Sequence, residues 1–534
     1  MTLQVSQAIP PGTGPSAADK ALAPCRRGAR DMKQAWARHY PETVLALVAL
    51  ATWWLMQGRV LPDDVGWQFW TARQMLGGTR LYDQLWEVNP PLWFWSAIPL
   101  EWMAERTGIV WGDVLAGAVV MLGAGCAWLT AHLLETRTPA GRLAALLLVF
   151  AMTVILPASL TGQREQLALI VALPYAALIA RRRAGVVVAP VLAVGVAVLA
   201  SYGFALKHYF IAVPVLLEAW LMLHYRARWR PWRPELMVLA GLALAYAAAV
   251  VILAPAFFTV MLPMVDTAYF GSQQTLLFTL VKPYVLFWVV AGLFLWLTRR
   301  EPSGEANPVA DAAVPALLLA WLGFALGYVL QSRGWNYHSI AATGAIGTAV
   351  GIRALRMRAW PGRAVSGAIL AGLILVMYPY RPERAPEDAL LDRVAPGEGV
   401  FVAGFDASAN FRRGRENLVW VSRTYSLWMV GALAKAEAEG RTSPALAALE
   451  AQVLAAVSQD IRCNPPQLIV MQATPGVPGR GGDFSFDEFL LRDAALRRFI
   501  AEHYAPARGE PIGAVYWRRG PVPRGAEPAC RSIR

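Results

Sequence analysis

Charged residues are scarce in this sequence. Lys, Arg, Asp and Glu make up 16% of the 534 residues, whereas apolar residues make up 56%; a soluble domain has about a quarter of its residues charged. Continuous apolar blocks recur along the chain, and many approach the ~20 residues that a helix needs to cross a bilayer. Only helices and closed barrels satisfy their backbone polar groups in lipid, and these blocks do not alternate with polar residues. The composition therefore predicts an α-helical polytopic membrane protein and argues against a barrel.

Cysteine is also scarce, and none of the four cysteines has a zinc-type spacing. We expect Cys25 on the cytoplasmic side and Cys126 within a span, whereas Cys463 and Cys530 fall in a C-terminal outer domain. In an oxidising compartment this last pair forms a disulfide, or both remain free thiols. The sequence leaves both alternatives open.

Positive charge is in excess, with a net charge of +13, but its distribution indicates membrane topology rather than a nucleic-acid partner. The basic residues cluster between apolar blocks, at Arg26 to Lys33, Arg137 with Arg142, Arg181 to Arg183, Arg226 to Arg233, Arg299 with Arg300, and Arg353 to Arg363. By the positive-inside rule these segments are cytoplasmic. Residues 1–40 are predicted to be a disordered cytoplasmic tail, and the first span is predicted to be retained as a signal anchor.

This rule gives about eleven spans, within a transmembrane module over residues 41–380. The expected spans are Thr43 to Gly58, Val110 to Leu134, Leu143 to Leu160, Leu167 to Ala180, Gly185 to Tyr202, Phe210 to Leu223, Leu236 to Pro255, Tyr284 to Leu297, Val314 to Leu330, Ile340 to Ile352, and Ala364 to Met377. An odd number places the N-terminus in the cytoplasm and the C-terminus outside it. We therefore expect a multi-pass protein of the inner (cytoplasmic) membrane.

Residues 381–534 have the composition of a soluble domain. Strand-like runs at Gly399 to Phe405, Gln467 to Met471 and Ala514 to Trp517 alternate with helical segments such as Pro444 to Val457. This pattern predicts a small periplasmic α/β domain. It contains no Gly-rich phosphate loop, no Gly-x-Ser-x-Gly elbow and no His-Glu-x-x-His motif, so no second active site is expected there.

The first outer loop, residues 61–109, concentrates the residues suited to chemistry. Asp63 and Asp64 follow the first span, either as catalytic carboxylates or as acids that cap the following helix. Gly77-Gly78, Leu81-Tyr82-Asp83 and Asn89-Pro90-Pro91 then introduce a second, aromatic helix.

That order resembles the GT-C superfamily of lipid-dependent glycosyltransferases, the group of the protein O-mannosyltransferases and the lipid A aminoarabinose transferase. The resemblance rests on an acidic pair (Asp63-Asp64), a Gly-Leu-Tyr type turn (Gly78 to Asp83) and an Asn-Pro-Pro element at comparable spacing. It covers the first third of the chain directly. Asn89 stands where the family more often has His. The resemblance implies a GT-C type fold and a polyprenyl-phosphate-linked sugar donor.

Further candidates lie in other outer connections. The resemblance extends to Thr161 to Gln166, where the family often has an Arg followed closely by an acid. It implies Glu165 as a candidate second carboxylate and Arg164 as a candidate phosphate partner; the alternative is a pair that only caps a helix. Three bases that the positive-inside rule disfavours at their positions are candidates for the donor phosphate, with snorkelling as the alternative: Lys207, Lys282 and Arg333. Tyr82, Asn89, Trp335, Tyr337 and His338 are candidates for substrate binding, with interfacial packing as the alternative.

The resemblance implies transfer with inversion. Asp63 takes the proton of an acceptor hydroxyl on a glycan, lipid or protein as the lipid phosphate leaves. Asp64 or Glu165 orients the acceptor, holds a divalent cation or keeps the base ionised; no other cofactor is expected. The alternative is a lipid-linked-sugar flippase or other transporter, which would place its charges near the bilayer midplane. A ligase or polymerase using pyrophosphate-linked donors and an envelope scaffold are the remaining alternatives.

Overall fold

The computed structural model describes residues 39–59, 61–136, 138–268, 275–301, 307–358, 360–377, 387–405, 411, 417–474, 484–522 and 530. The predicted tail over residues 1–40, with Cys25 and the first basic cluster, lies almost wholly outside these residues, as does Arg137. All candidate site residues lie within them.

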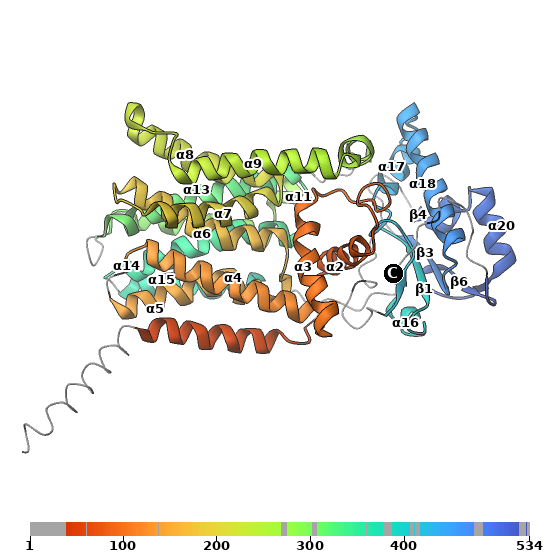
Figure 1. The fold of residues 1–534 in the computed structure, drawn as a ribbon, viewed down its shortest axis with the longest axis horizontal. Helices are drawn as coiled ribbons and strands as arrows, with labels where there is room; N and C mark the ends of the chain where they lie inside the picture. Colours follow the sequence, from red (N-terminus) through yellow and green to blue (C-terminus); the bar gives the residue numbers. More distant parts are fainter. Residues whose placement is uncertain are drawn as a thin grey trace, which may run out of the picture.

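A bundle of long helices forms the larger part of the molecule (Figure 1). After a helix over residues 39–56, its members are α4 (Trp111–Leu133), α5 (Pro139–Phe150), α6 (Arg164–Arg183), α7 (Pro190–Ala205), α8 (Ala212–Tyr225), α9 (Pro234–Leu253), α12 (Pro283–Thr298), α13 (Pro308–Gln331), α14 (Ile340–Arg356) and α15 (Trp360–Met377), with the shorter α10 (Leu262–Ala268) and α11 (Leu276–Leu280). Each predicted span overlaps one of these helices. By length and composition, Trp111–Leu133, His208–Arg228, Pro234–Leu253 and Pro308–Gln331 can cross a membrane.

Local sequence sets where many of these helices begin. Proline occupies the first turn of α5, α7, α9, α12 and α13, where its missing N–H has no intrahelical acceptor in any case. The side chains of Thr138 and Asn307 accept hydrogen bonds from the first backbone N–H groups of α5 and α13.

Helix α6 is the centre of the bundle. Its residues from Arg164 to Ala180 are all buried, and it packs against α4, α7, α13 and α14. A helix that is buried on every side has its position fixed by its neighbours. The two charged residues at its N-terminus, Arg164 and Glu165, are therefore held rigidly inside the protein.

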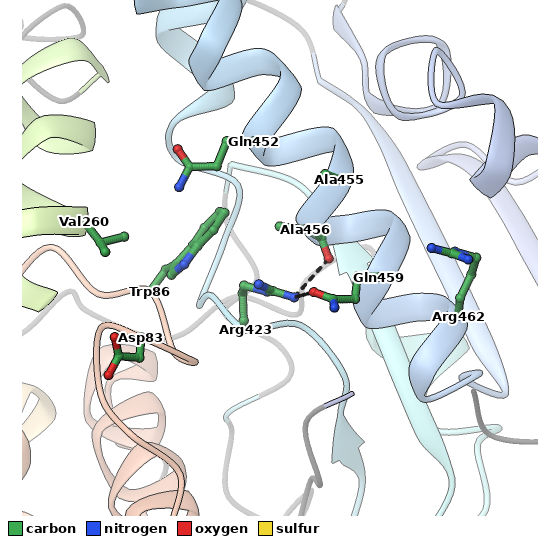
Figure 2. A pocket seen from close by; sticks show the side chains of 9 residues that line it. All are labelled: Asp83, Trp86, Val260, Arg423, Gln452, Ala455, Ala456, Gln459 and Arg462. Atoms are coloured by element: carbon green, nitrogen blue, oxygen red, sulfur yellow. Dashed lines mark hydrogen bonds between the residues drawn. The ribbon is translucent and has the colours of Figure 1, made fainter. Parts of the chain in front are cut away.

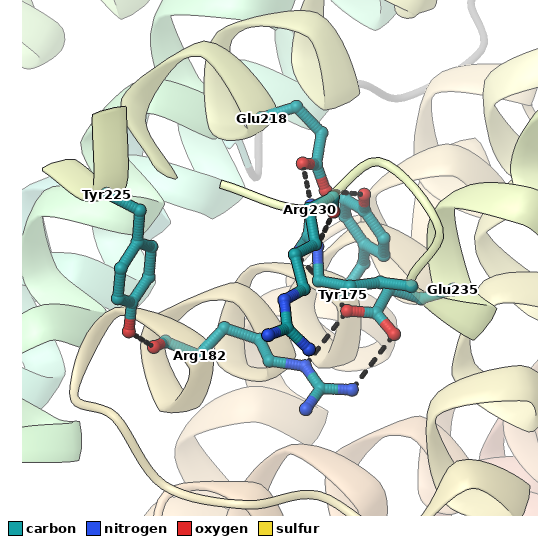
Figure 3. A network of polar contacts seen from close by, with 7 residues as sticks. Tyr175, Arg182, Glu218, Tyr225, Arg230 and Glu235 are labelled. Atoms are coloured by element: carbon teal, nitrogen blue, oxygen red, sulfur yellow. Dashed lines mark hydrogen bonds and ion pairs between the residues drawn. The ribbon is translucent and has the colours of Figure 1, made fainter. Parts of the chain in front are cut away.

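The far end of α6 carries a buried polar network (Figure 3). Arg182 binds Glu235 through two hydrogen bonds of 2.9 and 3.0 Å. Arg233 bridges Glu235 and Glu218, and the hydroxyl of Tyr175 donates to Glu218. Because these residues belong to α6, α8, α9 and the α8–α9 connection, the network ties three helices together.

The C-terminal region forms the predicted α/β sheet. Strands β1 (Gly399–Ala403), β2 (Val419–Trp420), β3 (Leu468–Thr474), β5 (Tyr504–Ala507) and β6 (Gly513–Arg518) lie in the order β2-β1-β3-β6-β5, and β4 (Phe484–Ser485) pairs with β3. The β2–β1 and β1–β3 pairs are parallel and the others antiparallel. The helices of this region are α16 (Asp388–Leu391), α17 (Val430–Ala438), α18 (Pro444–Cys463), α19 (Phe486–Leu490) and α20 (Ala494–His503). Cys463 and Cys530 form a disulfide.

Two helices of the first outer loop, α2 (Asp63–Leu76) and α3 (Leu92–Thr107), lie between the bundle and the sheet (Figure 1). The backbone N–H of Trp86 donates to the carbonyl of Arg423 over 2.7 Å. A Cβ atom at Gly66 would lie 2.1 Å from the carbonyl oxygen of Phe411, so only glycine allows this approach of α2 to the C-terminal region.

Candidate functional site

The candidate site forms where α6 begins. Helix α5 continues into a π-helical turn, Ala151–Ile155, and a 3-10 turn, Ala158–Leu160, before the chain reverses at Gly162. Gly162 has φ +87°, and a Cβ atom there would lie 2.7 Å from the Leu115 side chain. Its N–H donates to Gln166 and its carbonyl accepts from the indole of Trp93. This turn fixes the first residues of α6 against the outer loop.

An ion pair joins two of the predicted residues. The Lys207 ammonium lies 2.6 Å from Glu165 Oε1 and donates to Gln331 Oε1 over 2.8 Å. His338 Nε2 lies 4.0 Å from the same Glu165 oxygen, and the Tyr337 ring centroid lies 5.8 Å from the Lys207 ammonium. The start of α6, the end of α7 and the segment after α13 therefore meet at one end of the bundle.

Arg164 lies beside this pair and is buried. Its guanidinium is 4.5 Å from the ring centroid of Trp93, a cation–π contact with α3. Its Nε and Nη1 atoms are buried and make no hydrogen bond with any of the residues that the structure describes. Buried N–H donors are rarely left unpaired in a folded protein. Arg164 thus presents donors that suit an anionic ligand.

The acidic pair begins α2, and Glu165 lies in the first turn of α6. No described side chain accepts a capping hydrogen bond at either helix, but acids in a first turn favour the positive end of the helix. Both the catalytic and the helix-terminus interpretations therefore stay open. Burial raises the pKa of Asp64, while Arg164, a hydrogen bond from Gln163 and Lys207 act to lower it. Asp64 is thus electrostatically coupled to the Arg164–Glu165–Lys207 cluster, and Asp63 is its neighbour in the chain.

The basic side chains of this cluster, Lys207, His338 and Arg164, differ in their protonation state. Burial lowers the pKa of Lys207 to about 8, although Glu165 opposes this shift. Burial also lowers the pKa of His338 well below its usual range, and Lys207, Arg164 and Arg333 lower it further. His338 is therefore neutral at pH 7, and Arg164 and Lys207 supply the positive charge.

Arg333, Lys282 and Trp335 lie at the edge of this cluster. The Arg333 guanidinium is 5.7 Å from the Trp335 ring centroid. The Lys282 ammonium is 3.6 Å from the Phe278 ring centroid, and its side chain packs near Gly334. The Trp335 ring lies 5.3 Å from His338 and is 46% exposed.

A carboxylate that the sequence did not single out, Glu87, completes the site on the outer-loop side. It is buried and accepts hydrogen bonds from the Trp67 indole (2.7 Å) and from the backbone and side-chain amides of Asn89 (2.9 and 2.6 Å). Burial raises the pKa of Glu87, while the Asn89 N–H and Arg164 oppose the shift. The one signal in the sequence is an acid inside an aromatic, apolar stretch, Leu85-Trp86-Glu87-Val88.

Tyr82 and Asn89 support this carboxylate. Tyr82 is fully buried with φ +73°, and its hydroxyl donates to the Asn89 carbonyl over 2.6 Å. The amide of Asn89 is in turn committed to Glu87. The contacts of Tyr82 and Asn89 therefore fix the conformation of the loop around Glu87.

Comparison with solved structures identifies the architecture. ArnT from Cupriavidus metallidurans bound to undecaprenyl phosphate superposes with a TM-score of 0.50 and 15% sequence identity, over 89% of this chain and 97% of that one. The chain has the fold of ArnT. This is the GT-C type of fold that the loop motifs imply. The apo state of the same ArnT gives a TM-score of 0.49 and 16% identity over the same shares of the two chains. No protein-family model and no curated protein matches the sequence.

The cluster brings carboxylates able to accept a proton together with buried cations able to neutralise a phosphate. In the described part of the chain, no three His, Cys, Asp or Glu residues come together as metal ligands. A divalent cation would here rely on one or two carboxylates and on the substrate phosphate, as Mg²⁺ commonly does.

Proposed function

We propose that this protein is an integral-membrane glycosyltransferase that moves a sugar from a polyprenyl-phosphate donor to an acceptor hydroxyl. The observation that carries the proposal is Arg164, whose buried Nε and Nη1 atoms find no acceptor among the described residues and which lies beside Lys207, in the field of Asp64, Glu87 and Glu165. A donor phosphate would satisfy those donors. The ArnT fold supports this choice, since the ArnT structure was obtained with undecaprenyl phosphate.

In this proposal the donor phosphate lies against Arg164 and Lys207, with Arg333 and Lys282 at the edge, and the isoprenoid lies along the helices. Asp63 accepts the proton of the acceptor hydroxyl, whose oxygen forms a bond to the anomeric carbon. The bond from that carbon to the phosphate oxygen breaks, and the phosphate leaves with the electron pair, stabilised by both cations. Attack opposite the leaving group inverts the anomeric centre.

Asp64 and Glu165 position the reacting groups. Glu165 holds the Lys207 ammonium, and Asp64 is hydrogen-bonded to Gln163 next to the guanidinium of Arg164. Tyr337, His338 and Trp335 line the side of the cluster that a sugar would face. Transfer takes place on the outer face of the inner membrane, with the N-terminus in the cytoplasm and residues 381–534 in the periplasm.

The experiment supplies purified protein with radiolabelled polyprenyl-phosphate sugars and crude envelope acceptors. Asp63→Asn is expected to lower transfer by a factor of 10² or more, the range of general-base catalysis, while retaining donor binding. Glu105→Gln, which changes an exposed acid on α3, should retain wild-type transfer. Undiminished transfer by Asp63→Asn would remove that residue from the base role. If the wild type binds the lipid phosphate but transfers no sugar, the flippase is the better proposal.

A further inference from the structure

A pocket with a volume of about 500 Å³ lies between the first outer loop and the C-terminal α/β region. Asp83 and Trp86 line it from the outer loop, Val260 from the segment before α10, and Gln452 and Gln459 from α18 (Figure 2). Its volume is typical of a small-molecule site.

The floor of this loop–domain pocket is preorganised. Arg423 binds both carboxylate oxygens of Asp460, at 2.8 to 3.1 Å, and also donates to Gln459. Its guanidinium lies 5.4 Å from the Trp86 ring centroid, and its carbonyl accepts the Trp86 N–H. An indole, a guanidinium and an amide are thus fixed before any ligand enters, which reduces the entropy lost on binding.

The chemistry of the lining suits an uncharged saccharide. Gln452 and Gln459 carry amides that both donate and accept hydrogen bonds, as ring hydroxyls require, and the largely buried Trp86 adds an aromatic edge to the lining. Two of the charged lining residues have partners of opposite sign, because Arg423 pairs with Asp460 and Asp83 lies 3.5 Å from Arg80. Arg462 also lines the pocket.

Trp86 and Glu87 connect the pocket to the candidate site. They are consecutive residues, with Cα atoms ~3.8 Å apart; Trp86 faces the pocket, whereas Glu87 lies in the field of Arg164. A ligand in the pocket would thus contact the residue that precedes Glu87 in the chain. The isoprenoid of the donor would lie on the bundle side. The pocket is therefore available to the acceptor.

We propose that the loop–domain pocket binds the water-soluble, uncharged saccharide portion of the acceptor. This inference rests on the proposed function, because only a transferase has an acceptor. Saccharide binding, however, can be measured without transfer. The pocket holds the acceptor at a point remote from its reacting hydroxyl, and so contributes to its affinity rather than to the chemical step.

The test fills the pocket from α18. Ala455 lines the pocket and is exposed, so Ala455→Trp adds bulk there without disturbing the core. Ala447→Trp, on an exposed position two turns earlier on α18, is the matched control. Gln452→Leu removes an exposed amide with little change of size. Binding of fluorescently labelled, uncharged di-, tri- and tetrasaccharides is measured on the full-length protein in nanodiscs.

The wild type is expected to bind at least one of these saccharides. Ala455→Trp should weaken that binding by about tenfold or more, Gln452→Leu by several-fold, and Ala447→Trp by less than twofold, all with unchanged thermal unfolding. Absence of binding to the wild type, equal binding by Ala455→Trp, or a preference for phosphorylated saccharides would overturn the proposal. Asp63→Asn should bind saccharides like the wild type. If saccharides bind but no variant or wild type transfers sugar, the pocket stands and the transferase proposal fails.

Discussion

Lys207 is the residue through which pH should act most directly on the proposed reaction. Its pKa is lowered to about 8, so its ammonium is present below pH 8 and is lost as the pH rises. Since kcat/KM reports the ionisations of the free enzyme, it should fall on the order of tenfold per pH unit above that value. Lys207→Arg keeps the charge at these pH values and should remove this alkaline decline, whereas Lys282→Arg should not. An unchanged decline in Lys207→Arg would assign it to another group.

Glu87 holds three donors of the outer loop, and its removal should affect folding as well as activity. Glu87→Ala leaves the Trp67 indole and the two amide donors of Asn89 without their acceptor. Each buried donor left unpaired costs about 1–3 kcal/mol. We expect a clear decrease in the free energy of unfolding, measured by thermal unfolding in detergent, and little change for Glu105→Ala at an exposed position of α3. Equal behaviour of the two variants would contradict the supporting role of Glu87.

The sequence alone indicates most of the charged residues of the candidate site, but it does not indicate the buried carboxylate Glu87. Lys207, Lys282 and Arg333 stand out because bases are disfavoured at outer connections, and the family resemblance indicates Arg164 and Glu165. Glu87 gives no such signal, because its burial depends on Trp67, twenty residues earlier in the chain. The roles of the site residues stay predictions, although the structure brings Glu165, Lys207 and His338 within contact.

At the scale of elements, helices were easier to predict than strands. Continuous apolar blocks bounded by prolines and basic residues locate the helices of the bundle, although the number that crosses the membrane stays a prediction. Strands β2 and β4 have two residues each, and β5 contains Pro506, so none has a period that the sequence alone reveals. They exist because β1, β3 and β6, which the sequence does indicate, provide partners for them.

The network at the far end of α6 should contribute strongly to helix packing. Glu235 is fully buried between Arg182 and Arg233, so Glu235→Gln removes the carboxylate that pairs with Arg182, while Arg233 keeps its ion pair with Glu218. Because Arg182 is partly exposed, the cost should lie below the about 3–5 kcal/mol of breaking a fully buried pair. Asp311→Asn is the matched control, because Asp311 pairs with Arg356 on the surface, where a pair is worth about 0–1 kcal/mol. Thermal unfolding should separate the two variants, and equal shifts would show that the network is solvated.

At the scale of the whole molecule, the outer loop is the layer that joins the two parts. Its helices α2 and α3 contact the bundle through Trp93 and Gly162, and the loop contacts the C-terminal region through Trp86 and Gly66. The sequence indicates each part separately, but nothing local in it indicates that the two parts enclose the loop. The same loop therefore contacts the Arg164 cluster through Trp93 and lines the loop–domain pocket through Asp83 and Trp86.

The disulfide tests the proposed orientation of the whole chain. Cys463 and Cys530 are 67 residues apart, so the bond removes on the order of 4 kcal/mol of loop entropy from the unfolded C-terminal region. Such a bond persists in an oxidising compartment. In intact spheroplasts, a membrane-impermeant maleimide should therefore label Cys463 and Cys530 only after reduction, and Cys25 only after the membrane is opened. A Cys126→Ala background removes the buried free thiol. Labelling of Cys25 in intact spheroplasts, with Cys463 and Cys530 protected even after reduction, would invert the topology and place the Arg164 cluster on the cytoplasmic side.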